Sequence, residues 1–199
     1  MQRIRIRTEL IGMLNIVMKI SKTYGLHAWK QDGSMHEGIE GFLREHEPVR
    51  LTLRTLGGIG EIRAQQKDIY VVENPAVFSV LTSQNPACAA VCVSGQPRLA
   101  ALLLLDFLKE NHRFWYAGDF DPEGLLIAQR LKERYGETLH FWKYEVQWYE
   151  QYLSSVRLSE SRIKKLEHVY MQELQDIKEG MQKRKRAAYQ ETMLQVYLE

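Results

Sequence analysis

Residues 114–126 read FWYAGDFDPEGLL, and the interpretation of the chain begins with them. The apolar run FWYA meets Gly118, after which Asp119 and Asp121 stand one residue apart ahead of a helix-like segment. This order predicts a buried strand, a tight turn and a helix, with two carboxylates at the carboxyl end of the strand. Open α/β sheets bind ligands at that edge, and hard divalent cations such as Mg²⁺ prefer carboxylate oxygens. A solvated Asp-Pro turn is the alternative interpretation.

Similar apolar runs occur at regular intervals on both sides of this segment. They lack polar alternation and lie at 69–72, 89–93, 114–117 and 139–142. Helix-like segments separate them, at 77–82, 99–108 and 124–134. This order indicates βαβ units of a parallel sheet, and continuous apolar strands suit a sheet that is covered on both faces. We therefore expect an α/β fold with a Rossmann-like, parallel four-stranded sheet and flanking helices.

The core is expected at residues 61–150, with a different segment on each side. For residues 1–60 we predict a strand at 3–7, a helix near 10–18, a loop or short-helix linker at 25–40 and a strand at 48–56. Residues 151–199 predict a helical extension, in which apolar residues between Leu158 and Ile177 share one face and Ser159 or Ser161 is the N-cap. Gly180 and the following basic run are expected to interrupt it before a closing helix at 187–198.

The composition is that of an ordinary globular protein with unevenly placed charge. The net charge is only +2, but six Lys and Arg residues fall within residues 1–30, and Lys183, Arg184, Lys185 and Arg186 form a second cluster. Such clusters suit phosphates, although a solvated helix face is the alternative. The two cysteines, Cys88 and Cys92, are interpreted as small buried hydrophobes, which fits a reducing cytoplasm. No apolar run has the roughly 20 residues needed to cross a bilayer, so no membrane association is expected.

Acidic and turn residues follow three of the predicted strands. Glu73 comes after the first, Ser94 and Gly95 after the second, and Asp119 and Asp121 after the third. Because parallel strands share a direction, these residues are expected at one edge of the sheet. Three carboxylates there would repel one another unless a cation neutralised them, and an all-oxygen ligand set favours Mg²⁺ or Mn²⁺. The free N–H groups of the 94–95 turn could bind a phosphate oxygen.

This pattern of a glutamate after the first strand and DxD after the third resembles the Toprim domain of topoisomerases, primases and several nucleases. The segments VVENPAVFSVL, VCVSGQP and YAGDFDPEGLLIAQRL resemble more closely the C-terminal Toprim domain of a bacterial family linked to SMC-like, Wadjet-type plasmid-defence operons. That family is related to the topoisomerase VI A subunit. The resemblance covers roughly residues 42–198, including PVRLTLRTL and AAYQETMLQVYL at its two ends.

The resemblance implies roles for individual residues. Glu73 would serve in catalysis or metal binding, and Asp119 and Asp121 would be the Mg²⁺ ligands. Glu123 occupies a variable position of the family and would contribute at most an outer-sphere or second-metal carboxylate. Asn74 and Gln96 match the family pattern and would orient phosphate or water; a role in stabilising the turns is the alternative.

Two departures from the family bear on activity. Topoisomerase VI-like proteins cut with a tyrosine from a separate domain, whereas Tyr116 here lies within a predicted strand and is interpreted as a core residue. Members of the defence type also carry a substantial N-terminal domain, so residues 1–60 are interpreted as a possible remnant of one.

The function expected from these observations is metal-dependent hydrolysis of DNA by the nuclease subunit of an SMC-like defence complex. Its expected partners are DNA, the other subunits of that complex and a second copy of the chain. The phosphate-binding residues would be Asn74, Ser94, Gly95 and Gln96 together with the cluster at 183–186. The rival hypothesis is a non-catalytic Toprim-fold module that binds DNA or protein partners. A DxD phosphatase of the haloacid-dehalogenase type fits less well, because its DxD follows the first core strand.

Overall fold

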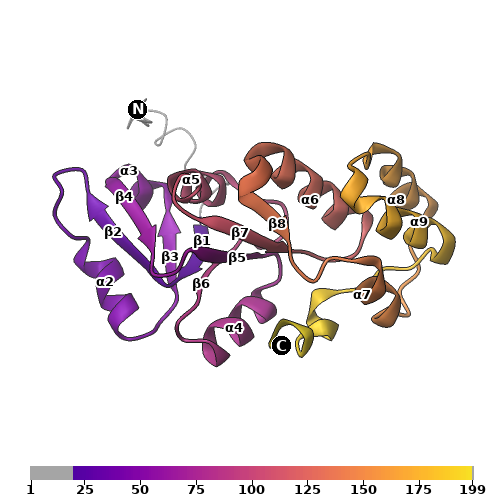
Figure 1. The fold of residues 1–199 in the computed structure, drawn as a ribbon, viewed down its shortest axis with the longest axis horizontal. Helices are drawn as coiled ribbons and strands as arrows, with labels where there is room; N and C mark the ends of the chain where they lie inside the picture. The colour runs from indigo at the N-terminus through magenta and orange to yellow at the C-terminus, as the bar shows by residue number, and fades with distance from the viewer. Residues whose placement is uncertain (1–19, 199) are drawn as a thin grey trace.

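The structure is a computed structural model that describes residues 20–198. Its centre is a six-stranded sheet, and a separate two-stranded sheet lies at one end of the molecule (Figure 1). In spatial order the central strands are β3 (Val49–Thr52), β1 (Ile20–Tyr24), β6 (Ala89–Cys92), β5 (Asp68–Val72), β7 (Arg113–Ala117) and β8 (Leu139–Phe141). The small sheet pairs β2 (Leu26–Lys30) with β4 (Ile59–Ala64).

The four predicted apolar strands are present and pair in parallel, but the sheet does not stop at four strands. Strand β5 lies between β6 and β7, and β8 follows β7, all in parallel register. Strands β1 and β3 extend the sheet beyond β6 in antiparallel orientation. The expectation of a purely parallel, four-stranded sheet was therefore wrong in its extent. These short strands come from before the βαβ series, and their sequence carries no indication of which sheet edge they join.

Helices cover both faces of the central sheet. In Figure 1, α5 (Leu99–Leu108) and α6 (Pro122–Tyr135) lie above it, and α4 (Pro75–Gln84) lies below. All three agree closely with the helices predicted between the apolar runs. Their buried residues form one continuous core with the strands, in which the inward-facing residues of β5, β6 and β7 are fully buried. Cys88 and Cys92 are buried free thiols within this core, as predicted.

The N-terminal region contains more regular structure than the sequence predicted. The expected linker at 25–40 is instead strand β2 followed by α2 (Glu37–Arg44). Two histidines of this segment hold it in place: His27 pairs with the buried carboxylate of Glu40 at 2.9 Å, and His36 caps α2. The strand predicted at 48–56 ends at Thr52, whose hydroxyl caps the short helix α3 (Leu53–Gly57). The predicted strand at 3–7 and helix near 10–18 lie outside the described residues.

The C-terminal region is built from short helices and not from two long ones. It contains α7 (Val146–Gln151), α8 (Glu160–Lys164), α9 (Gln175–Arg184) and the 3₁₀ helices η2 (Lys165–His168), η3 (Gln172–Leu174), η4 (Gln190–Met193) and η5 (Val196–Leu198); a further 3₁₀ helix, η1 (Gly136–Thr138), precedes β8. Ser159 caps α8, as predicted. Helix α9 runs through Gly180, so this glycine does not interrupt it, and the closing helix predicted at 187–198 is replaced by η4 and η5.

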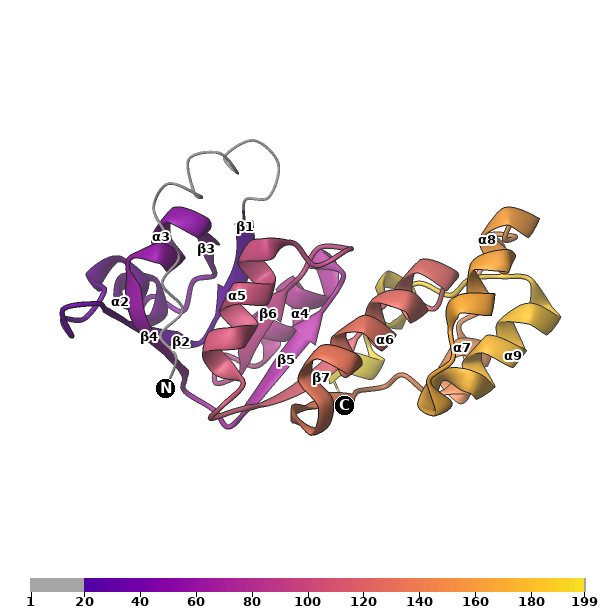
Figure 2. The ribbon, with the colours of Figure 1, turned by 90° about the horizontal axis from the view of Figure 1, so that it is seen from above.

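The C-terminal helices stand at the end of the molecule opposite the small sheet, and the last residues return toward α4 (Figures 1 and 2). The return begins where Ala188 pairs with Phe120 in an isolated bridge, just beyond the end of β7. It places η4 next to the carboxyl ends of the parallel strands. Within residues 20–198, no helix is both long and apolar enough to cross a membrane.

Candidate active site at the strand ends

Glu73 leaves strand β5 beside the end of β7. Its backbone N–H donates to the carbonyl of Ala117 at 3.1 Å, which extends the parallel pairing by one residue. Asn74 follows as the N-cap of α4 and accepts the N–H of Ala76 at 2.7 Å. The strand and the helix thus fix the backbone on both sides of the glutamate. Its carboxylate points to β7, where Oε2 is 3.4 Å from both the Asp119 N–H and the Tyr116 hydroxyl.

Two glycines permit the close turn between β7 and α6. A Cβ on Gly118 would lie 2.4 Å from the Tyr116 hydroxyl and 2.9 Å from the Glu73 carboxylate. A Cβ on Gly124 would lie 2.1 Å from the backbone oxygen of Asp119. Since such distances are shorter than van der Waals contact, only glycine leaves this turn undisturbed. The Tyr116 side chain is fully buried beneath it, which agrees with the prediction of a core residue.

Glu73 and Asp119 hold their protons more tightly than ordinary carboxylic acids. Burial, followed by the charge of Asp119, raises the pKa of Glu73 to about 7. Burial, with the charges of Asp121 and Glu191, raises the pKa of Asp119 to about 6 against an opposing hydrogen bond from Gln190. Partial burial next to other carboxylates produces this effect, and perturbed pairs of this kind concentrate at functional sites.

Asp121 and Glu123 differ from this pair because two basic side chains already neutralise them. Asp121 caps α6 through the Gly124 N–H at 2.7 Å, and its other oxygen lies 2.5 Å from the Arg162 guanidinium. Glu123 binds Arg162 at 2.6 Å and Lys165 at 2.7 Å. These contacts outweigh burial and lower the pKa of Glu123 to about 2. Both basic residues come from the α8–η2 segment, which sequence reasoning did not connect with the site.

The predicted metal ligands are therefore only partly free to bind a cation. Asp119 uses Oδ1 to accept the Gln190 N–H, whereas its Oδ2 and the Oε1 of Glu73 have no hydrogen-bond partner among the described residues. Both oxygens of Asp121 are engaged by the helix cap and the arginine. Within residues 20–198, no three His, Cys, Asp or Glu side chains are arranged as a ready metal site. Glu73 and Asp119 thus each have one oxygen that a hard cation could use, whereas Arg162 occupies the corresponding oxygen of Asp121.

Gln190 connects the end of the chain to both strand ends, a connection that sequence reasoning missed. This side chain is fully buried, and its Oε1 accepts the Asn74 backbone N–H at 2.9 Å. The backbone N–H of Gln190 donates to Asp119 Oδ1 at 2.8 Å. The next residue, the exposed Glu191, accepts a hydrogen bond from the Asn74 side chain. The only signal in the sequence was a polar Gln-Glu pair inside the apolar closing segment. Asn74 thus stabilises the turn and also ties it to η4.

The predicted phosphate-binding turn lies beyond β6 with an unusual backbone. Ser94 and Gly95 both have left-handed conformations, with φ of 54° and 79°. The Ser94 hydroxyl lies 3.4 Å from the Cys92 sulfur, whose other neighbour is the Glu73 carbonyl at 3.8 Å. The turn therefore adjoins the Glu73 strand end. Helix α5, however, starts at Leu99 with Arg98 as its N-cap, so Gln96 and its neighbours separate the turn from the helix.

The basic run at 183–186 is exposed at the end of α9. Arg184 pairs with Glu150 at 3.3 Å, and Lys185 pairs with Glu160 at 2.8 Å. Lys183 has no ion pair within the described part of the chain. The backbone of Arg186 accepts the Tyr149 hydroxyl at 2.9 Å, just before the chain returns to the carboxylates. The run is thus partly neutralised, and it stands four residues ahead of Gln190.

Residues 49–199 match the model of a family described as protein of unknown function C-terminus (DUF2399). A search of curated proteins finds no match to the chain. The matched region includes Glu73, both aspartates, Arg162 and Gln190, and it leaves out β1, β2 and α2.

Proposed function

The chain belongs to the family described as protein of unknown function C-terminus (DUF2399), and we propose that it is a divalent-metal-dependent, Toprim-type nuclease that hydrolyses DNA. The proposal includes the role of nuclease subunit in a bacterial SMC-like plasmid-defence complex, with DNA, the other subunits and a second copy of the chain as partners. That role rests on the sequence resemblance. The chemistry rests on the residues at the strand ends.

One observation carries the chemical proposal: Glu73 and Asp119, 46 residues apart in sequence, meet at adjacent parallel strand ends with raised pKa values. Each keeps one carboxylate oxygen without a partner among the described residues. An uncompensated, partly buried pair of this kind favours binding of a small hard cation, because a cation offsets both the repulsion and the burial cost. Structural ion pairs, by contrast, normally include their own basic partner, as Glu123 does here.

The side chains divide the work of the proposed reaction. Mg²⁺ or Mn²⁺ held by Glu73 and Asp119, with Asp121 as third ligand, would supply charge for the phosphate and lower the pKa of an attacking water. A Glu73 oxygen that does not contact the metal would take the proton of that water. The backbone of Gln190 orients Asp119, and the turn at 94–95 and Lys183 would bind DNA phosphates without reading sequence.

The test is cleavage of supercoiled plasmid in Mg²⁺ or Mn²⁺. Glu73→Gln and Asp119→Asn should abolish nicking, since each removes a ligand charge while keeping the shape of the side chain. The matched control is Glu61→Gln, which removes an exposed carboxylate paired with Arg63 in the small sheet. Nicking at the wild-type rate by both site variants would refute the assignment of the site.

A second candidate is favoured by the contacts of Arg162. Arg162 and Lys165 already neutralise the negative charge of Asp121 and Glu123 at the strand ends. These two carboxylates therefore need no metal, as would be the case in a module that only binds DNA or protein partners. Calorimetric titration with Mn²⁺ separates the two candidates. Binding that disappears in Asp119→Asn supports the nuclease, and no heat of binding at millimolar Mn²⁺ supports the non-catalytic module.

A further inference from the structure

A row of aromatic side chains crosses the sheet on the side of α4. Tyr70, Trp115 and His140 are neighbours in register across β5, β7 and β8, and Trp142 lies two residues beyond His140. The ring centres of Tyr70 and Trp142 are 4.5 Å apart, and those of Trp115 and His140 are 5.0 Å apart. All four side chains are half-buried, whereas Phe114 and Tyr116 on the opposite side of β7 are fully buried. This part of the sheet is an aromatic surface that the protein leaves partly open.

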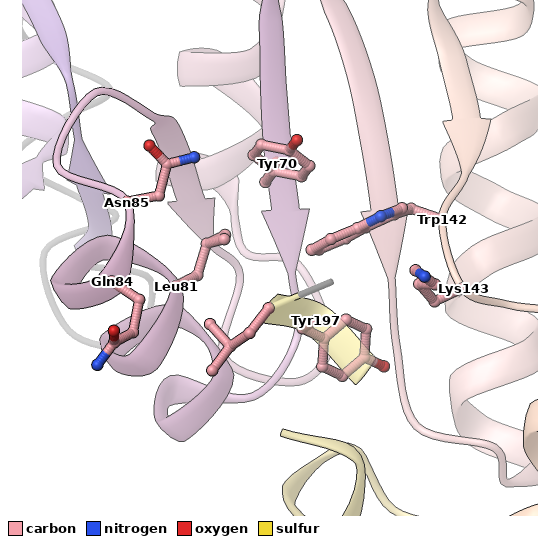
Figure 3. Close-up of a pocket in the computed structure, with 8 residues that line it drawn as sticks. Tyr70, Leu81, Gln84, Asn85, Trp142, Lys143 and Tyr197 are labelled. Carbon is pink, nitrogen blue, oxygen red and sulfur yellow. The ribbon is translucent and has the colours of Figure 1, made fainter. Parts of the chain in front are cut away.

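A cavity of about 420 Å³ adjoins this surface. Tyr70, Trp142 and Tyr197 form its aromatic wall, and the ring centres of Trp142 and Tyr197 are 5.1 Å apart. In Figure 3, Trp142 projects toward Tyr70 and Tyr197, while Gln84 and Asn85 come from the opposite side, at the end of α4. This volume falls within the range of roughly 300–1,000 Å³ that is usual for small-molecule sites.

The side-chain amides beside the cavity are available to a ligand. The side-chain amides of Gln84 and Asn85 have no hydrogen-bond partner within residues 20–198, and both residues are exposed. Lys143 also lines the cavity, but its ammonium lies 5.3 Å from the ring centre of Trp148. Its backbone is left-handed, with φ of 52°, a conformation that non-glycine residues seldom adopt outside constrained sites. Flat aromatic faces with nearby amides and a cation suit a planar heterocycle that stacks and forms hydrogen bonds along its edge.

The cavity is connected to the carboxylates through one buried residue. Tyr197 in its wall receives a hydrogen bond from the Gln190 side chain at 3.3 Å, and the Gln190 N–H donates to Asp119 at 2.8 Å. A group bound against Tyr197 therefore lies one hydrogen-bonded residue away from the proposed reaction centre. A single nucleotide of DNA has this form, with a flat base on one side of its sugar and a phosphate on the other.

We propose that the cavity binds an unpaired nucleobase of single-stranded DNA, which stacks on Trp142 and Tyr70 and is contacted along its edge by Asn85. The inference rests on the proposed function for its choice of DNA as ligand. It adds that the strand at the site is unpaired or locally opened, because a base inside a duplex cannot reach a cavity of this kind.

The experiment measures binding without cleavage. A short single-stranded oligodeoxynucleotide with one 2-aminopurine is titrated with the protein in EDTA, and the same oligonucleotide with an abasic site at that position is the reference. Stacking should quench the 2-aminopurine fluorescence. Trp142→Leu should weaken binding roughly 5- to 100-fold, as expected for the loss of one stacked base, and should remove the quenching. The matched control is Trp29→Leu in the small sheet, which should leave binding unchanged.

Trp142→Leu could weaken DNA binding by disturbing the fold, so a second variant changes a residue that is not expected to affect folding. The change Asn85→Ala alters only an exposed side chain, and it should alter the relative affinities for oligonucleotides of the four bases. The proposal is overturned if the abasic oligonucleotide binds as tightly as the intact one. It is equally overturned if Trp142→Leu changes self-association in sedimentation while DNA binding stays the same, since the surface would then contact a second copy. Because EDTA prevents metal-dependent cutting, a failure of the nuclease proposal leaves these readouts intact.

Discussion

Replacement of Gln190 by methionine tests whether the end of the chain holds the carboxylate site together. Methionine has a similar length and volume, so the variant removes polar contacts without opening a large cavity. The backbone N–H of Asn74 then loses its acceptor, and the hydroxyl of Tyr197 loses a donor. The expected result is a less stable protein in which Asp119 is less firmly held.

The magnitude follows from the hydrogen bonds of a fully buried side chain. An N–H left without an acceptor costs about 1–3 kcal/mol, and the longer bond to Tyr197 contributes about 0.5–1.5 kcal/mol. The free energy of unfolding should therefore fall by about 1.5–4.5 kcal/mol in Gln190→Met. Urea unfolding followed by circular dichroism measures this change from the midpoint, provided that its slope stays constant.

Gln129 provides a matched control. It is another buried glutamine, and its side chain accepts the N–H groups of Tyr170 and Met171 at 2.8 and 3.1 Å and donates to the His168 carbonyl at 3.1 Å. Gln129→Met should cost at least as much stability. Only Gln190→Met, however, should also weaken Mn²⁺ binding and plasmid nicking at a temperature where both variants are folded.

Two results would refute this reasoning. The first is a free energy of unfolding of Gln190→Met within about 0.5 kcal/mol of the wild-type value, which is the usual range for a surface substitution. The buried hydrogen bonds of Gln190 would then contribute nothing measurable to stability. The second is an equal loss of Mn²⁺ affinity in both glutamine variants, because general destabilisation would then explain the effect.

The remaining predictions concern the residues around this link. Arg162→Gln should tighten Mn²⁺ binding roughly tenfold by calorimetry, because it frees Asp121 from one charge-assisted contact of ~1.4 kcal/mol; unchanged or weaker binding would contradict this. In EDTA, the free energy of unfolding should fall as the pH rises from about 4 to about 7, because over this interval the folded protein keeps the protons of Asp119 and Glu73 that the unfolded chain has lost. Glu73→Gln should flatten this dependence, and stability that instead rises over this interval would show that the carboxyl groups are not perturbed in this way. Gly124→Ala should destabilise the protein by about 1–3 kcal/mol in thermal unfolding, because its Cβ would lie 2.1 Å from a backbone oxygen, and an unchanged midpoint would mean that the turn relaxes freely.

The sequence alone determined the parallel part of the fold and the meeting of the two strand ends. Continuous apolar runs such as 69–72 and 114–117 favour a parallel sheet with helices on both faces, although Tyr70 and Trp115 on one face are only half-buried. Once the strands are parallel, Glu73 and Asp119 must leave the same edge. The local sequence pattern therefore predicts that these two residues lie close together. The chemistry of the pair is a proposal.

Only the tertiary structure decided which other side chains reach that edge. Gln190 lies 116 residues from Asn74, and Arg162 lies 41 residues from Asp121. The return of the chain along Phe120 and the placement of α8 depend on packing between segments that have no shared periodicity. The positions of β1 and β3 in the sheet also depend on such packing, because their short sequences do not specify which edge of the sheet they join. Local residue patterns indicate which side chains are buried and which way the strands run. The hydrogen-bond and ion-pair partners of a polar group, by contrast, come from distant segments, and these contacts exist only once the chain has packed.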